Sequence, residues 1–236
     1  MKSFSGDTEL ARRTKEETLV TRNKLLDAAE CLFQAQGVSR TTLQHIALRA
    51  GATRGAVYWH FKDKADLFNA MMERVTLPME ASFSLEDTSV PGSGEAAGNA
   101  LQRILQCTQG ALRQIVTDAQ TRRVFEVATH KVEYVEELQA VRLRHITVRN
   151  GFLSRIEQSI EAASQQTGQP LPVSASVAAQ GLHALIDGII QNWLLNPQNF
   201  DLLKVGTSSI GIYLSGLGFR AEQQGLATAE KDPLST

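Results

Sequence analysis

The sequence predicts an all-α protein with a three-helix N-terminal domain followed by a larger helical domain. Apolar residues recur at helical spacing along most of the chain, as in Leu67, Phe68, Met71 and Val75. No alternating pattern bounded by turn dipeptides competes with this spacing. The chain has 236 residues and 42% hydrophobic content, which is enough to bury a core. We therefore expect a folded helical protein rather than a disordered one.

Four helices are predicted for the N-terminal part, over residues 15–36, 42–50, 53–60 and 63–82. The first stops at Gly37, a residue that tolerates the left-handed conformation of a helix C-terminus. The next two have Thr41 or Thr42 and then Thr53 as N-cap candidates, and Asp63 can cap the fourth. The caps divide this part into short helices that follow a long one.

Helices in the C-terminal part are predicted over residues 95–117, from 118 to 130 and onward to about 166, then over 174–195 and 201–219. The Pro- and Gly-containing stretch Glu86–Gly98 is a predicted loop. Its glycines fit no nucleotide-binding motif, because no strand precedes them and the spacing is wrong. We place the two domains at residues 11–62 and 63–221, with residues 1–10 and 222–236 as flexible tails.

Positive charge is concentrated near the N-terminus, although the formal net charge of the whole chain is −1. Between Ala11 and Asp66 there are ten Lys or Arg against six Asp or Glu, a net charge of +4. The remainder carries 14 basic and 19 acidic residues, a net charge of −5. Only the N-terminal part is therefore suited to a polyanion such as DNA.

Several other protein classes are not expected. Two cysteines, Cys31 and Cys107, make neither a disulfide framework nor a four-ligand zinc site, so we expect reduced thiols in a cytoplasmic protein and no metal. No cofactor is expected. Residues 1–10 lack the apolar region of a signal peptide, and polar residues interrupt Val177–Leu195, so no membrane span is predicted. No catalytic motif or plausible carboxylate pair indicates an enzyme.

The segment Leu43–Lys62, LQHIALRAGATRGAVYWHFK, has the pattern of a helix-turn-helix. Ala47 leaves room for a second helix crossing at a steep angle, and Gly51 supplies the turn. Three apolar residues pack this pair onto the first helix, namely Ile46, Val57 and Phe61. Such a unit places its second helix in the major groove of DNA.

Eight residues are predicted to contact double-stranded DNA: Thr42, Thr53, Arg54, Gly55, Tyr58, Trp59, His60 and Lys64. Arg54 can donate hydrogen bonds to guanine edges. Thr53, Tyr58 and His60 are better suited to phosphates, and Lys64 adds a cation at the next helix start.

Some of these assignments have alternatives. Gly55 permits close approach to the groove wall, and Thr42 stands at a helix N-terminus that offers backbone donors to a phosphate. Core packing is the simpler expectation for Trp59 and Phe61, although Trp59 is kept as a DNA-contact candidate. Three basic residues, Arg12, Arg13 and Lys15, contact the DNA backbone or minor groove, or form a solvated helix lead-in.

Drawn on a helical wheel, residues 174–195 separate into three faces. The large apolar face comprises Leu182, Leu185, Ile186, Ile189, Ile190 and Trp193. A strip of small residues suited to close helix packing comprises Gly181, Ala184 and Gly188. A narrow polar stripe comprises Gln180, His183, Asp187 and Gln191, and it either meets water or lines part of a mainly apolar cavity.

The segment Thr21–Phe68 resembles the TetR family of repressors, and this combination of motifs is highly specific. The segments Thr121–Tyr134 and Leu185–Leu203 extend the resemblance to the AcrR- and TtgR-type branch, whose members repress multidrug efflux pumps. The resemblance implies a homodimer that binds a palindromic operator through its helix-turn-helix. A four-helix bundle from the last two helices of each subunit, including Gly181, Ala184 and Gly188, would form the dimer interface.

The resemblance also implies a lipophilic or aromatic inducer bound in the C-terminal domain. The residues expected to line its cavity are Val75, Cys107, Ala111, Phe125, Thr129, Phe152, Ile156, His183, Ile186 and Asp187. Each apolar member has plain core packing as its alternative. A regulator of a metabolic or signalling operon with a different ligand is the second hypothesis. A DNA-binding protein that senses no ligand is the third.

Overall fold

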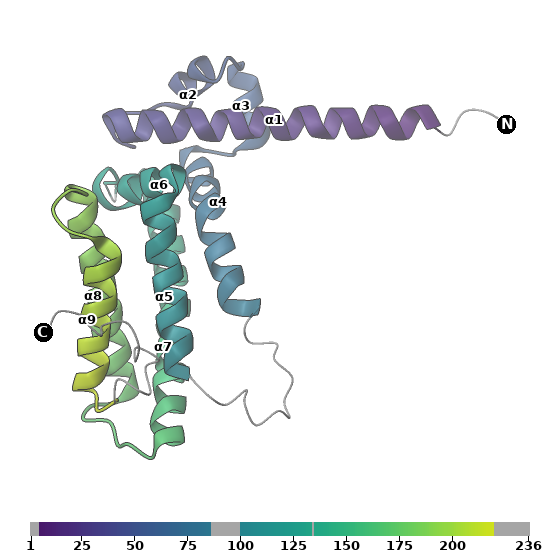
Figure 1. Ribbon diagram of the computed structural model, residues 1–236. Coiled ribbons are helices and arrows are strands. Elements are labelled where there is room, and N and C mark those ends of the chain that lie inside the picture. The colour runs from purple at the N-terminus through teal and green to yellow at the C-terminus, as the bar shows by residue number, and fades with distance from the viewer. Residues whose placement is uncertain (1–4, 86–99, 134, 220–236) are drawn as a thin grey trace, which may run out of the picture. The chain divides into compact units, whose positions relative to one another are not determined.

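The computed structural model describes residues 5–85, 100–133 and 135–219, and every regular element in these ranges is helical (Figure 1). The helices are α1 (Ser5–Gln36), α2 (Leu43–Arg49), α3 (Arg54–His60), α4 (Lys64–Leu85), α5 (Ala100–Thr117), α6 (Ala119–His130), the 3-10 helix η2 (Glu136–Leu138), α7 (Gln139–Thr167), α8 (Ala175–Leu195) and α9 (Leu202–Gly216). The predicted all-α class is confirmed.

Polar side chains cap the helices where the sequence predicted. The Thr42 hydroxyl accepts a hydrogen bond from the His45 backbone N at 3.2 Å, and the Thr53 hydroxyl accepts one from Ala56 N at 3.1 Å. Asp63 accepts from Asp66 N at 2.8 Å. Each cap satisfies a backbone donor that has no partner within the helix, which stabilises the helix by about 1 kcal/mol.

Two helix boundaries differ from the sequence prediction. Helix α1 begins at Ser5, so residues 5–10, expected as part of a flexible tail, continue the helix. The long segment predicted from residue 118 to 166 is interrupted between His130 and Gln139, and η2 lies in the interruption. There the carbonyl of Lys131 accepts a hydrogen bond from Val38 N at 3.1 Å, a partner outside the helix. The predicted loop 86–98 and the tail 222–236 lie outside the described residues.

The chain divides into two compact units that draw on alternate parts of the sequence. The N-terminal unit comprises Met1–Thr76 and Arg123–His145, and the C-terminal unit comprises Leu77–Arg122 and Ile146–Thr236. The N-terminal unit is larger than the predicted domain 11–62, because α4 and α6 contribute to the same core as the helix-turn-helix. Leu67 and Met71 of α4 and Val124 and Val127 of α6 are fully buried in that core.

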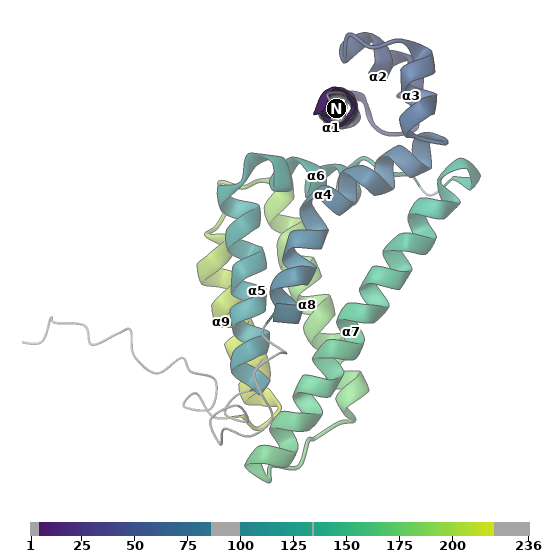
Figure 2. The same cartoon turned by 90° about the vertical axis from the view of Figure 1, so that its right-hand side faces the viewer.

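Within the C-terminal unit, α9 lies beside both α5 and α8 (Figure 2). Leu112 of α5, Leu182 of α8 and Ile210 of α9 are each at most 1% exposed. Full burial of each such side chain contributes roughly 1.5–3 kcal/mol. The Tyr213 hydroxyl of α9 donates to the carbonyl of Ala178 in α8 at 2.8 Å, which adds a polar contact between these two helices.

Candidate functional site

The helix-turn-helix is built as the sequence predicted. Gly51 has φ +64°, and Ala52 N donates to the carbonyl of Ala47 at 2.9 Å to close the turn between α2 and α3. Ile46, Val57 and Phe61 are at most 2% exposed, so their side chains fasten both short helices to the core. In Figure 2, α2 and α3 are seen beside α1, which is viewed end-on. Because α3 has only seven residues, this packing rather than intrinsic helicity holds it in place.

Helix α3 turns its buried residue Val57 inward and presents a polar and aromatic surface to solvent. Arg54 and Gly55 are exposed, and Tyr58 is 50% exposed. The Arg54 guanidinium lies 5.5 Å from the centre of the Tyr58 ring, in a cation–π arrangement. The exposed face therefore offers a guanidinium and a phenol at adjacent positions, which are donors suited to base edges and phosphates.

Trp59 does not pack in the core, which corrects the simpler expectation for this residue. Its side chain is 72% exposed, whereas Phe61, two residues later, is 2% exposed. Val57 is the buried residue of α3, and Phe61 enters the core directly after the helix ends. Trp59 instead contacts the His60 ring edge-on, with the ring centroids 4.6 Å apart. Its exposure leaves it available as a DNA contact.

His60 is partly buried at the end of α3, and its pKa is lowered from the ordinary value of 6.5. Burial is the main cause, and the nearby positive charge of Arg22 is the second. The imidazole is therefore neutral at pH 7, so at that pH it offers a DNA phosphate a neutral N–H rather than a cation.

The hydroxyls of Thr42 and Thr53 cap their helices as acceptors and keep their own hydrogen as a donor. Each oxygen already accepts from the first turn of its own helix, and both residues are exposed. A hydroxyl that accepts in this way retains its own hydrogen, which it can donate to a phosphate oxygen. Both threonines thus fix a helix terminus and present a donor beside it.

Lys64 differs from the expectation of an available cation. Its side chain is only 7% exposed, because it extends from the start of α4 into the N-terminal unit. The ammonium donates to the Ser39 carbonyl at 3.3 Å and forms an ion pair with Glu137 of η2, also at 3.3 Å. Lysine is almost never buried without such partners. In this structure the charge of Lys64 is compensated from within the chain.

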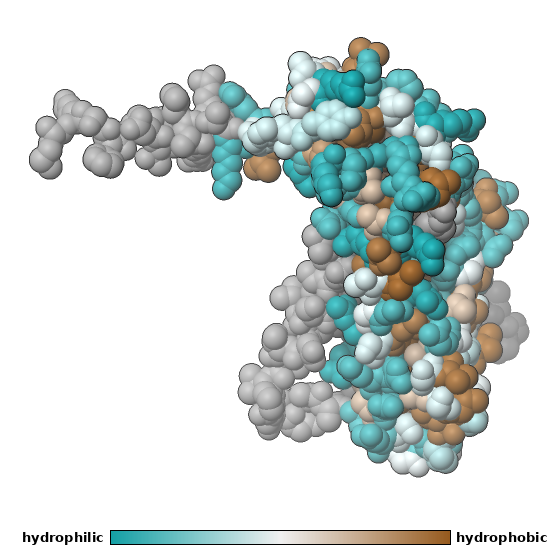
Figure 3. Space-filling view, turned by 180° about the vertical axis from the view of Figure 1, so that it is seen from behind, coloured by the Kyte–Doolittle hydropathy of each residue, from teal (hydrophilic) through white to brown (hydrophobic). Residues whose placement is uncertain are grey.

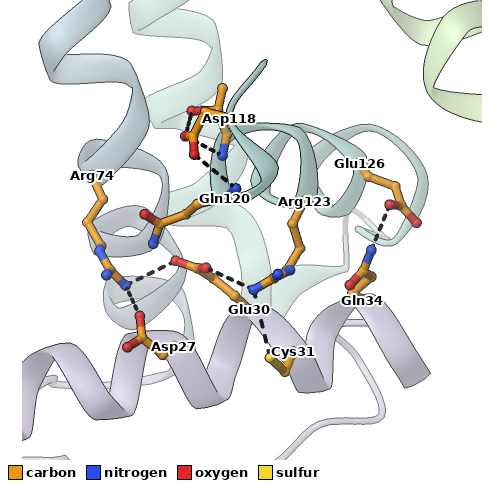
Figure 4. A network of polar contacts seen from close by, with 10 residues as sticks. Asp27, Glu30, Cys31, Gln34, Arg74, Asp118, Gln120, Arg123 and Glu126 are labelled. Carbon is orange, nitrogen blue, oxygen red and sulfur yellow. Dashed lines mark hydrogen bonds and ion pairs between the residues drawn. The ribbon is translucent and has the colours of Figure 1, made fainter. Parts of the chain in front are cut away.

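Sequence reasoning missed a buried ionic network that holds α1 against α4 and α6 (Figure 4). Glu30 of α1 is 1% exposed, and its two carboxylate oxygens pair with Arg74 of α4 at 3.0 Å and Arg123 of α6 at 3.7 Å. Arg74 also pairs with Asp27 at 2.8 Å. A buried carboxylate needs such compensation, and removing one partner of such a pair typically costs about 3–5 kcal/mol. The network therefore fixes how the helix that supports α2 and α3 is seated.

The residues predicted to line a ligand cavity fall in both units. Val75, Phe125 and Thr129 belong to the N-terminal unit, where Val75 is 3% exposed and Phe125 packs against the core. The other seven are in the C-terminal unit: Cys107, Ala111, Phe152, Ile156, His183, Ile186 and Asp187.

In the C-terminal unit, the structure brings two of these residues into ring contact. The Phe152 ring of α7 meets the His183 ring of α8 edge-on, with centroids 5.9 Å apart. Ile156 and Ile186 are buried, and Cys107 and Ala111 are half-buried.

The polar stripe of α8 mostly meets solvent in the single chain. Gln180, Asp187 and Gln191 are exposed, and the Asp187 carboxylate accepts from the Gln191 amide at 2.6 Å. His183 is the half-buried member of the stripe. Of the polar groups proposed to orient a ligand, His183 is therefore the one that the fold encloses.

The small residues of α8 have two different surroundings. A Cβ at Gly181 would lie 2.2 Å from the Tyr213 hydroxyl, so the helix approached at this position is α9 of the same chain. A Cβ at Gly188 would meet nothing within 4 Å, and Ala184 is exposed. These two residues lie on a face that includes the exposed apolar residues Val177 and Leu195. Apolar side chains also reach the surface among polar ones on the face seen in Figure 3.

The described residues hold neither a metal-binding cluster nor a membrane-spanning helix. No group of three or more His, Cys, Asp or Glu side chains there is arranged to hold a metal ion. None of the helices in those ranges has the length and apolarity needed to cross a membrane. A polar cleft of about 230 Å³ lies in the N-terminal unit between residues 35–40 and 130–133, and its lining includes none of the predicted ligand residues.

Comparisons with known proteins agree with this geometry. Residues 25–71 match the family described as bacterial regulatory proteins, tetR family, and residues 99–219 match the MAATS-type transcriptional repressor, C-terminal region. The chain is 34% identical over 205 residues to the HTH-type transcriptional regulator AcrR of Shigella flexneri, a match that covers 87% of this chain and 93% of AcrR.

Two solved structures extend the comparison to the fold. NalD, the secondary repressor of the MexAB-OprM multidrug efflux pump in Pseudomonas aeruginosa, matches with a TM-score of 0.74 and 33% identity, over 86% of this chain and 98% of NalD. A complex of SmeT with triclosan matches with a TM-score of 0.70 and 28% identity, over 83% of this chain and 90% of SmeT. SmeT represses the Stenotrophomonas maltophilia multidrug efflux pump SmeDEF. With a helix-turn-helix exposed as DNA recognition requires and matches along most of its length, the chain belongs to the TetR family and is a DNA-binding transcriptional repressor, not an enzyme.

Proposed function

We propose that this protein represses a multidrug efflux pump operon and is released from its operator by lipophilic or aromatic inducers. The surface of α3 is the observation that supports DNA binding: this helix packs through Val57 and exposes Arg54, Tyr58 and Trp59. The efflux assignment is supported by the functions of NalD and SmeT, which are relatives of similar fold. A repressor of this kind acts on DNA in the cytoplasm.

The repressor would bind a palindromic operator as a homodimer. Val177, Leu195 and Ile212 are 57%, 69% and 74% exposed on α8 and α9, and association would remove this apolar area from water. Gly188 and Ala184 lie on the same face of α8 and permit close approach of a second helix. A two-fold dimer presents two recognition helices, which fit half-sites about one helical turn apart, roughly 34 Å.

The inducer would bind in the C-terminal unit, beside the Phe152 and His183 rings. Buried Ile156 and Ile186 offer apolar surface, and half-buried His183 offers a polar group that can orient a ligand. Burial of apolar area discriminates poorly between shapes, so we expect a broad range of micromolar ligands rather than one tight ligand. The triclosan complex of SmeT supports an aromatic ligand class.

Isothermal calorimetry with and without operator tests the proposal directly. We expect planar aromatic compounds to bind one site per subunit and to weaken operator affinity 10- to 100-fold, which needs about 1.4–2.8 kcal/mol of coupling. Operator-bound protein must then bind the compound more weakly by the same factor. Phe152→Leu should lower the affinity of the protein for the compound. Leu143→Ala, at an exposed position of the same helix, should leave that affinity unchanged. Compounds that bind but leave operator affinity unchanged would refute the induction mechanism.

A further inference from the structure

Lys64 is a buried cation at the start of α4, close in sequence to the recognition helix α3. It is the first residue of α4 and follows the end of α3 by four residues, so it stands next to the recognition helix in the chain. Its side chain is 7% exposed. Its ammonium donates to the carbonyl of Ser39, three residues before the Thr42 cap of α2. The charge of Lys64 thus lies beside the segments that lead into α2 and α4.

The ion pair of Lys64 is asymmetric. The lysine side chain is 7% exposed, whereas its partner Glu137 is 62% exposed. A buried ammonium without a counter-ion is costly, so Lys64 requires an anion at this position. Glu137 supplies that anion from the solvent side, through the short helix η2. Because an exposed carboxylate is readily rehydrated, Glu137 can leave at small cost if another anion takes its place.

We propose that Glu137 is an internal counter-ion that competes with a DNA phosphate for Lys64 and thereby lowers the affinity of the repressor for DNA. The inference rests on the proposed binding of operator DNA by α3 and on the sequence prediction that Lys64 contacts DNA. A phosphodiester oxygen carries the same charge as the carboxylate and accepts the same charge-assisted hydrogen bond. On binding, the ammonium exchanges the Glu137 carboxylate for a phosphate oxygen, and the carboxylate returns to water. The free energy of the broken pair is subtracted from the binding energy.

Glu137→Gln and Glu136→Gln form a matched pair for the test. Both residues are exposed, lie next to each other in η2 and lose one negative charge, but the Lys64 ion pair is made by Glu137. Any general gain from reduced repulsion of DNA is therefore common to both variants. We expect Glu137→Gln to bind duplex DNA roughly threefold to tenfold more tightly than Glu136→Gln at low salt.

A second arm shows whether the gain acts through Lys64. Lys64→Gln should weaken DNA binding and reduce the salt dependence of log K by about one phosphate contact. In the Lys64→Gln background, Glu137→Gln and Glu136→Gln should bind equally. Thermal unfolding of each variant checks that it is folded. If Lys64→Gln does not fold, the matched pair alone decides.

Both arms are measured by fluorescence anisotropy on an operator duplex and on a scrambled duplex. A phosphate contact carries no sequence information, so the Glu137→Gln gain should appear on both. Wild type binding both duplexes equally would refute the operator function, while the matched pair would still test the exchange. Glu137→Gln binding no more tightly than Glu136→Gln, or a gain that persists without Lys64, would overturn the proposal.

Discussion

Replacing Gly55 by alanine separates the stability of the recognition helix from its approach to DNA. Gly55 lies in α3 and is exposed, and a Cβ added there would meet only the Thr53 hydroxyl, at an ordinary contact distance of 3.8 Å. The methyl group therefore fits in the free protein. Alanine in a helix interior is more favourable than glycine by about 1 kcal/mol. Gly55 lies in the first turn of α3, so we expect a gain of at most about 1 kcal/mol, which corresponds to a rise in Tm of no more than roughly 2–4 °C for a chain of this size. Gly55→Ala should therefore be a slightly more stable protein.

The same substitution should weaken operator binding if Gly55 faces the wall of the major groove. Displacing α3 by a methyl group would disturb neighbouring contacts such as that of Arg54, and we expect at least a tenfold loss, about 1.4 kcal/mol. Gly110→Ala is the matched control, because Gly110 is an exposed glycine of α5 with nothing within 4 Å of an added Cβ. It should raise Tm without changing operator affinity. Calorimetric melting and mobility shifts measure both quantities. Unchanged operator affinity for Gly55→Ala would refute the close approach of α3 to DNA.

Three further predictions address specificity, assembly and pH. Arg54→Ala should relax discrimination at one base pair by about 1–3 kcal/mol while other positions stay selective, as competition with single-substituted operators would show. Gly188→Arg places a long charged side chain on the open face of α8, so light scattering should find monomers. If the variant dimerises as tightly as wild type, this face is not part of the dimer interface. The pKa of His60 lies below its ordinary value of 6.5, so the folded state binds the proton less readily than the unfolded state. The contribution of His60 to the free energy of unfolding is therefore present above pH 6.5 and falls as the pH drops below that value. Urea unfolding at pH 7.5 and 5.5 should show a smaller loss of stability for His60→Gln than for wild type. An equal loss in both proteins would show that the pKa of His60 is not lowered.

Features specified over a few residues could be predicted from the sequence. Thr42 and Thr53 were identified as caps because a cap depends only on the residue and on the backbone donor three positions later. Gly51 was placed in the turn because that backbone conformation disfavours other residues, and its φ of +64° agrees. The amphipathic pattern gave the helical class, since burial of one face repeats along each helix.

Features specified by distant partners could not be predicted. Lys64 has a charged, flexible side chain, and nothing near it in sequence shows that Ser39 and Glu137 will enclose it. Glu30 occupies a position that also suits a solvated helix face, and its burial depends on Arg74, 44 residues later, and on Arg123. For Trp59, hydrophobicity alone favoured a place in the core, but the side chain is 72% exposed. The sequence does not show that Val57 already occupies the buried side of the short helix α3.

The ionic network around Glu30 bears on how an inducer could act on α3. Helices α4, α6 and α7 each begin in one unit and continue into the other. Arg74 and Arg123, on two of these helices, hold the buried carboxylate of α1, and α2 and α3 are packed on α1. A change in the position of either arginine would leave Glu30 less compensated, and the unit would relieve that cost by moving α1 or by changing the seating of α3. A tenfold loss of DNA affinity requires only about 1.4 kcal/mol, which is less than the cost of removing one partner of a buried ion pair.

Arg123→Gln should therefore weaken operator binding in the absence of any inducer. It should also reduce the further loss of operator affinity that an inducer causes, because the substitution has already disturbed the seating of α1. Mobility shifts with and without compound measure both effects. Arg113→Gln is the matched control, because Arg113 is exposed on α5, loses the same charge and is not among the residues expected to contact DNA or line the ligand cavity. It should change neither the basal operator affinity nor the response to the compound. An Arg123→Gln protein that binds operator like wild type and responds fully to inducer would show that the network only stabilises the fold.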